Sequence, residues 1–145
     1  MEINPNTKNK IINYFSKRPE IAAVYLYGSR ARGDAKRSSD IDLAVLTTDK
    51  SRYTGLNSPQ ILFTQELSEI LNKKVEVQDL KTVRIDFAQR VLTEGKLLVS
   101  NNEKLRIKFE ESVFRRYFDL KPFLDEFYKS LSVMAKKGEI GARFT

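Results

Sequence analysis

Two short segments with strand character lie close together in the first third of the chain, and their spacing constrains the fold more than any other feature. IAAVYLYG, residues 21–28, is rich in β-branched and aromatic residues and closes on a glycine. SSDIDLAVL, residues 38–46, alternates acidic and apolar side chains through its middle. Ten residues separate Ser29 from Asp40, which is enough for a short helical turn and a loop. The pattern therefore predicts two neighbouring strands of one sheet.

Helical and strand patterns alternate along the rest of the chain. Apolar spacing predicts helices over about 7–17, 59–72, 83–95 and 102–137, and strands over 74–80 and 96–100. We expect Asn6 or Thr7 to cap the first helix and Pro122 to kink or break the last one. The alternation predicts an α/β (α+β) fold, with three to four strands flanked by helices. We expect one domain over residues 1–145, in which 102–145 is a C-terminal helical extension.

The amino-acid inventory excludes several kinds of chemistry. The 145 residues contain no cysteine and no histidine, which excludes disulfides, a Cys or His zinc site, a Cys nucleophile and a His-based triad. Acid–base and metal chemistry must then come from carboxylates. The chain has no apolar run long enough to cross a bilayer and no signal-peptide pattern at its start. We therefore expect a cytoplasmic location and no membrane association.

The connection between the first two strands carries a pattern that suits phosphate binding. Gly28 and Ser29 follow a strand, and in such a turn backbone N–H groups and a small hydroxyl can approach phosphate closely. Four basic residues nearby can supply countercharge to a triphosphate: Arg30, Arg32, Lys36 and Arg37. Each of these features alone is also typical of an ordinary turn or charged loop. Their joint order and spacing favour the functional interpretation.

Two aspartates at the start of the second strand are candidate metal ligands. Residues two apart on a strand share a face, so Asp40 and Asp42 can together bind hard cations and phosphate oxygens. Two Mg²⁺ ions held there would orient an α-phosphate and lower the pKa of an attacking hydroxyl. Glu76 is the candidate third carboxylate on a neighbouring strand, whereas Asp79 has the opposite parity. An isolated Asp-x-Asp pair is more often the solvated face of an edge strand.

The stretch GSRARGDAKRSSDIDLAV closely resembles the signature of the DNA polymerase β-like nucleotidyltransferase superfamily, in which Gly-Ser, ten residues and Asp-x-Asp follow one another. It is similar in particular to the minimal nucleotidyltransferases, which share these positions: Gly28, Ser29, Ala31, Arg32, Gly33, Ser39, Asp40, Asp42 and Leu43. The resemblance implies a polymerase β-like fold with a mixed sheet, ATP as substrate and Mg²⁺ as cofactor, with two ions expected. It implies catalytic and metal-binding roles for Asp40, Asp42 and Glu76, and nucleotide contacts from Gly28, Ser29, Arg30, Arg32 and Ser39.

One position departs from the family pattern. The third carboxylate is commonly Asp in the minimal proteins, and here it is Glu76, which is one methylene longer. Whether it ligates metal or acts as general base stays open, and Asp79 is the alternative carboxylate.

The resemblance also implies a partner. Minimal nucleotidyltransferases are commonly paired with a HEPN-domain ribonuclease, and the MntA-type antitoxins among them silence that toxin by adding AMP to a tyrosine hydroxyl. By resemblance we expect this chain to be such an adenylyltransferase, acting as the antitoxin of a HEPN toxin in a hetero-oligomer.

The C-terminal helical segment carries more apolar residues than one sheet face can easily cover. Its members are Leu105, Phe109, Val113, Phe114, Tyr117, Phe118, Phe123, Leu124, Phe127, Tyr128, Leu131 and Met134. The excess indicates either a partner surface or a helix that closes the core of a small domain, and the pattern alone favours neither.

Two alternative functions remain at this point. The same fold could act on a small molecule, such as an aminoglycoside, or on an RNA end. Alternatively, the formal charge of +7 and the aromatic helices could belong to a non-catalytic antitoxin or nucleic-acid-binding module. Direct nucleic acid binding is the least favoured, because aromatic residues concentrate on a helix instead of alternating with basic residues on a sheet.

Overall fold

A four-stranded mixed sheet forms the centre of the protein. The structure, a computed structural model, describes residues 3–33, 40–48 and 55–137. The strands are β1 (Ile21–Tyr27), β2 (Ile41–Thr47), β3 (Val75–Asp79) and β4 (Lys96–Ser100), in the order β3-β2-β1-β4. β1 is antiparallel to β2 and to β4, whereas β2 is parallel to β3. The predicted mixed α/β sheet, including its fourth strand, is confirmed.

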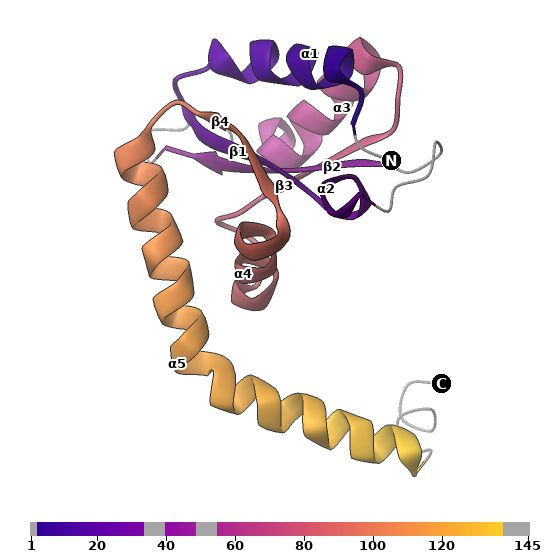
Figure 1. Ribbon diagram of the computed structural model, residues 1–145, viewed down its shortest axis with the longest axis vertical. Coiled ribbons are helices and arrows are strands. Elements are labelled where there is room, and N and C mark those ends of the chain that lie inside the picture. Colours follow the sequence, from indigo (N-terminus) through magenta and orange to yellow (C-terminus); the bar gives the residue numbers. More distant parts are fainter. Residues whose placement is uncertain (1–2, 34–39, 49–54, 138–145) are drawn as a thin grey trace.

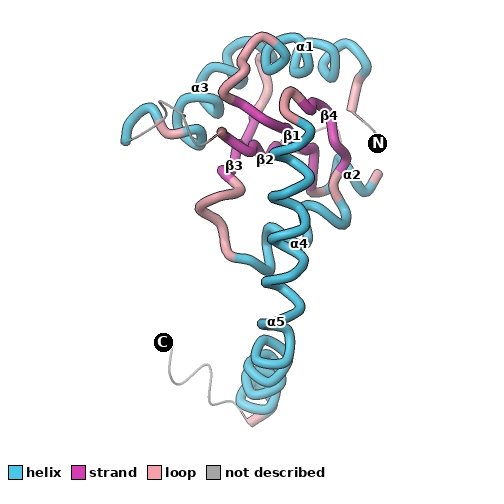
Figure 2. The backbone as a smooth tube through the Cα atoms, turned by 90° about the vertical axis from the view of Figure 1, so that its left-hand side faces the viewer, coloured by secondary structure: helices cyan, strands magenta, loops and turns pink. Residues whose placement is uncertain are grey.

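Helices cover both faces of this sheet. They are α1 (Pro5–Ser16), α2 (Ser29–Arg32), α3 (Pro59–Leu71), α4 (Ile85–Glu94) and α5 (Glu103–Lys136), with a 3₁₀ turn over Gly55–Asn57. α1 and α3 lie on one face, and α4 with the first half of α5 lies on the other (Figures 1 and 2). In the parts of the chain that the structure describes, no helix is both long enough and apolar enough to cross a bilayer.

Burial on both faces explains the nearly unbroken apolar sequence of β1. Phe15 of α1 and Phe63 of α3 pack edge to face with their centroids 5.3 Å apart over the first face, where Leu26 also points. The second face is lined with small residues such as Ala22 and Ala44, which let α4 and α5 approach closely.

The first helix begins earlier than predicted. Asn4 is its N-cap, and its side chain accepts a hydrogen bond from the backbone N–H of Asn6 at 2.8 Å. Pro5 takes the first helical position, where its fixed φ suits the helix and its missing N–H costs nothing. The prediction that Asn6 or Thr7 caps this helix was therefore wrong, because proline placed the start two to three residues upstream.

The last helix bends without breaking. α5 is continuous from Glu103 to Lys136 and contains Pro122. The helix changes direction along its length (Figure 1), as expected where a proline removes one hydrogen bond and clashes with the preceding turn. The predicted kink is confirmed and the alternative of a break is wrong. The first half of α5 packs on the sheet through Val113, and the second half extends beyond it.

Polar contacts fix where α5 starts and how it lies on the sheet. The side-chain amide of Asn101, between β4 and α5, donates to the backbone carbonyls of Phe15 and Ile21 at 2.9 and 3.0 Å. The Tyr25 hydroxyl donates to Glu110 Oε1 at 2.6 Å, and the same carboxylate accepts from Arg106 at 3.0 Å. These contacts hold α5 against β1 and so set the position of its second half relative to α4.

Candidate active site

Three polar side chains form a row across three neighbouring strands, at the end of β1 and near the starts of β2 and β3. In the strand register, Tyr27 of β1 lies opposite Asp42 of β2, and Asp42 lies opposite Glu76 of β3. Side chains that are directly opposite on paired strands point to the same face, so the three lie side by side on the α4 face of the sheet. Asp40 precedes β2 with the same parity as Asp42 and belongs to this face as well. The register thus places Asp42 beside Glu76, with Asp40 two residues before Asp42 on the same face.

Gly28 makes room for the central carboxylate. Its φ of +74° is a conformation that side chains rarely adopt, and a Cβ added there would lie 2.4 Å from Asp42 Oδ2. Only glycine allows both the turn and this close approach. The Gly-Ser turn and the aspartate pair therefore touch in space, although ten residues separate Ser29 from Asp40.

The electrostatics of the row disfavour its negative charges. Burial raises the pKa of Asp42 to about 6, and repulsion from Glu76 and Asp40 adds to this rise, against a smaller opposite effect of Arg32. Burial, followed by the charges of Asp42 and Glu76, also raises the pKa of the Tyr27 hydroxyl. Crowded carboxylates of this kind gain stability when a cation enters between them.

Asp40 and Glu76, the carboxylates beside Asp42, form only weak surface contacts. Asp40 Oδ2 lies 3.6 Å from the exposed ammonium of Lys74, and Glu76 Oε1 accepts a hydrogen bond from Gln78 at 2.9 Å. As they stand, no three carboxylates in the described residues are grouped closely enough to hold a metal ion. Asp40, Asp42 and Glu76 all supply oxygen donors, which suit Mg²⁺. The present contacts of Asp40 and Glu76 are with surface groups that water can replace. The residues therefore fit a divalent cation once Asp40 and Glu76 turn toward Asp42.

The alternative carboxylate lies elsewhere. Asp79 is opposite Val45 in the parallel ladder, so its side chain points to the other face of the sheet. It caps the turn after β3 by accepting a hydrogen bond from the backbone N–H of Lys81 at 3.0 Å. The structure therefore gives Asp79 a local structural contact and places Glu76 in the row.

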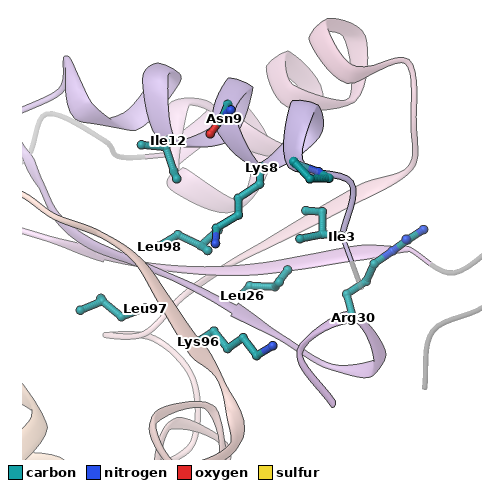
Figure 3. Close-up of a pocket in the computed structure, with 10 residues that line it drawn as sticks. Ile3, Lys8, Asn9, Ile12, Leu26, Arg30, Lys96, Leu97 and Leu98 are labelled. Carbon is teal, nitrogen blue, oxygen red and sulfur yellow. The ribbon is translucent and has the colours of Figure 1, made fainter. Parts of the chain in front are cut away.

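The predicted phosphate contacts are distributed over two places. Gly28 and Arg32 line a small cavity beside the row, and Ser29 begins α2. Arg30 is 6% exposed and lines a different cavity of about 550 Å³ under α1. Figure 3 shows it near Ile3 and Leu26 at one end of that cavity. Ser39, like Lys36 and Arg37, lies outside the described residues.

Several residues near the row were not predicted. The small cavity has a volume of about 150 Å³, and besides Gly28 and Arg32 it is lined by Tyr27, Phe87, Arg90, Val91 and Glu94. The Tyr27 and Phe87 rings pack edge to face with their centroids 5.4 Å apart. Tyr27 could have been found from its place before Gly28 on a strand. The α4 residues carry no motif, and only the packing of α4 on the sheet brings them here.

The raised pKa of Asp42 predicts a pH-dependent cost to the fold. Because the charged form is disfavoured in the folded state, the free energy of unfolding should fall as pH rises from about 4 to about 6. Asp42→Asn removes this cost, so above pH 6.5 the variant should exceed wild type by about 1–2 kcal/mol, allowing for partial solvent screening. Urea unfolding at pH 4 and pH 7.5 measures the difference, which should shrink toward zero at pH 4. Asp119→Asn, at an exposed position of α5, is the control. A stability difference between Asp42→Asn and wild type that is the same at both pH values would contradict the prediction.

Comparison with known proteins agrees with this fold. Residues 9–104 match the family described as Polymerase beta, Nucleotidyltransferase. The chain is 29% identical over 136 residues to the protein adenylyltransferase MntA of Shewanella oneidensis, which covers 91% of this chain and 95% of the relative.

Solved structures show the same similarity. A crystal structure of a toxin–antitoxin with AMP-PNP matches with a TM-score of 0.73 and 27% identity, over 86% of this chain and 98% of that chain. A crystal structure of a mutant of the toxin–antitoxin MntA-HpeT matches with a TM-score of 0.72 and 26% identity, over 90% and 99% of the two chains. The family match spans well over half of the sequence and includes the whole Gly-Ser and Asp-x-Asp pattern. This chain therefore belongs to the polymerase beta nucleotidyltransferase family.

Proposed function

We propose that this chain is a protein adenylyltransferase that moves AMP from ATP to a tyrosine hydroxyl of a cognate HEPN ribonuclease toxin and thereby acts as its antitoxin in the cytoplasm. The row in which Asp42 lies opposite Glu76, with Gly28 against Asp42, is the observation that carries the proposal. The relative from Shewanella oneidensis is named a protein adenylyltransferase, and the toxin–antitoxin with AMP-PNP shares the fold.

The residues have separate roles in this proposal. Asp40, Asp42 and Glu76 would hold Mg²⁺, with two ions expected, and Glu76 would complete the group as a third carboxylate. These carboxylates would place the cation where it could polarise the α-phosphate and lower the pKa of the acceptor hydroxyl. The nucleotide contacts that we propose come from Gly28, Ser29, Arg30, Arg32 and Ser39. Of these, Arg32 lies beside the row in the small cavity, whereas Arg30 acts from the other side of α2.

The transfer is a single displacement at phosphorus. The tyrosine oxygen forms a bond to the α-phosphorus of ATP, and the bond from that phosphorus to the bridging oxygen breaks. Pyrophosphate leaves, and the phenolic proton is lost. Tyr27 and Phe87 close one side of the half-buried Asp42 and limit the access of water there, whereas Glu76 is exposed.

The proposal is tested with the toxin encoded beside this gene. The chain, the purified toxin, Mg²⁺ and ATP labelled in the α-phosphate should give labelled toxin whose mass increases by whole AMP units, together with pyrophosphate. ATP labelled in the γ-phosphate should leave the toxin unlabelled, and EDTA should abolish the reaction. An unlabelled toxin, or label found instead on an RNA end or an aminoglycoside, would overturn the proposal.

A further inference from the structure

Two cavities on the α4 side of the sheet share residues and lead away from the carboxylate row. The first is the cavity of about 150 Å³ beside Tyr27 and Gly28, and Arg90 and Glu94 of α4 also line it. The second has a volume of about 430 Å³ and lies between α4 and the second half of α5, where the same Arg90 and Glu94 line it. The two cavities therefore adjoin each other at Arg90 and Glu94, between the row and the second half of α5. We call the second cavity the α4–α5 cleft.

The far wall of the α4–α5 cleft is held in place by a specific contact. Tyr117, Leu124 and Tyr128 line the cleft from one face of α5, at positions seven and four residues apart. The Tyr128 hydroxyl donates to Asp86 Oδ2 of α4 at 2.8 Å. Figure 1 shows the second half of α5 turning beneath α4. The cleft is thus preformed, and the bend of α5 is what creates it.

The charge of the α4–α5 cleft differs from that of the whole chain. The chain carries a formal charge of +7, yet the charged residues lining the cleft are Asp86, Glu94 and Asp125 with only Arg90. Arg84 and Lys121 pair with two of these acids from the outside, at 3.3 and 3.7 Å. Acids outnumber bases three to one in the lining itself, which disfavours a nucleotide polyanion there, and the basic groups of a polypeptide can replace the surface partners of Asp86 and Asp125. A ribonuclease must be basic where it binds RNA, so its surface near that region complements the cleft.

An exposed apolar stripe borders the α4–α5 cleft. Leu120, Phe123 and Phe127 are 43%, 74% and 52% exposed, and their spacing places them along one side of α5 next to the cleft-lining face. Buried aromatic residues supply most of the binding energy at protein interfaces. The combination of an apolar rim and an acid-lined cleft is typical of a protein-binding surface.

We propose that the α4–α5 cleft docks the acceptor protein and directs its tyrosine to the row. A basic segment of the toxin lies in the cleft, while the apolar stripe of α5 packs against the toxin's body. The acceptor tyrosine passes Arg90 and Glu94 into the cavity of about 150 Å³, which has room for one side chain and is too small for a nucleotide. Its hydroxyl there lies beside Gly28 and reaches the Asp42 carboxylate. This inference rests on the proposed function, since it names the acceptor site of that reaction.

Charge reversal and apolar truncation test the docking site. Glu94→Lys, Asp125→Lys and Phe123→Ser all change exposed side chains, and thermal melting checks that each variant folds like wild type. We expect each to raise the KM for the toxin in AMP transfer by about ten- to a hundredfold, and to weaken toxin binding in calorimetry to a similar extent. The affinity for AMP-PNP with Mg²⁺ should stay unchanged. Glu111→Lys, an exposed acid on the first half of α5 outside the cleft, is the matched control and should behave like wild type.

The possible results separate this inference from the proposed function. If wild type labels the toxin and the three variants keep its KM, the docking site lies elsewhere and the inference is overturned. A loss of AMP-PNP affinity in the cleft variants would assign the cleft to the nucleotide and would also overturn it. A wild-type chain that binds AMP-PNP but never labels the toxin contradicts the proposed function itself.

Discussion

Replacing Asp42 with asparagine is expected to reduce kcat/KM for AMP transfer by at least about a thousandfold, which corresponds to about 4 kcal/mol of transition-state stabilisation. The substitution keeps the size of the side chain and removes the charge at the centre of the row, where Glu76 and Tyr27 lie on either side. The ionised form of Asp42 is disfavoured in the metal-free fold. We therefore expect its charge to contribute most to transition-state stabilisation once a cation is bound. Single-turnover labelling of the toxin measures the effect.

The same variant separates catalysis from folding. Because Asp42→Asn removes a buried charge, we expect the loss of activity to accompany a fold that is more stable than wild type at neutral pH. Mg²⁺ with AMP-PNP should raise the melting temperature of wild type and should not raise that of the variant. Asp79→Asn, which points to the opposite face and can still cap its turn, is the matched control and should keep most of the activity. Comparable losses in the two variants would contradict the assignment of the row.

Local patterns in the sequence were sufficient to place Asp40 and Asp42 on one face of a strand and to name Glu76 as the candidate third carboxylate. Period two places Asp40 and Asp42 on one face, and the same parity rule separates Glu76 from Asp79 once β3 is paired with β2. Apolar spacing was likewise sufficient for the order of helices and strands, since each element buries one face or both. Periodicity depends only on neighbours in the sequence, whereas the position of Glu76 and Tyr27 beside Asp42 depends on the pairing of β3 and β1 with β2.

Features that depend on packing could not be predicted. Arg30 and Arg32 are two residues apart on a helical turn and therefore point in different directions, and only the position of α2 on the sheet decides which one adjoins the row. Arg90 and Glu94 adjoin the row because α4 packs on β1. The pattern of α5 also left two interpretations open, and packing separates the two halves: Val113 of the first half is buried in the core, whereas Phe123 beyond the bend is exposed.

Gly28→Ala is expected to reduce kcat/KM by about a hundredfold while the chain still folds. The added methyl group would lie 2.4 Å from Asp42 Oδ2 and 3.3 Å from its Cγ, so the carboxylate must turn away from its place in the row. A displacement of about 1 Å in a reacting group can cost about a hundredfold in rate. The φ of +74° with a ψ of −155° is a conformation almost confined to glycine, so alanine adds about 1–3 kcal/mol of backbone strain, which lowers the free energy of unfolding. Toxin labelling and urea unfolding measure the two effects.

Gly33→Ala separates the effect of the contact with Asp42 from the effect of backbone strain. Gly33 has a similar φ of +81°, yet a Cβ added there meets nothing within 4 Å. Its ψ of 6° is the ordinary left-handed conformation, whereas Gly28 has a ψ of −155°, so Gly33→Ala should lose less free energy of unfolding than Gly28→Ala, and only Gly28→Ala should lose most of its activity. Equal activity losses would show that the shape of the turn matters for catalysis, and that the close approach of Gly28 to Asp42 does not. If activity follows the contact instead, the motif glycine acts by leaving the aspartate free to reach its working position, which explains why Gly-Ser and Asp-x-Asp function as one unit across ten intervening residues.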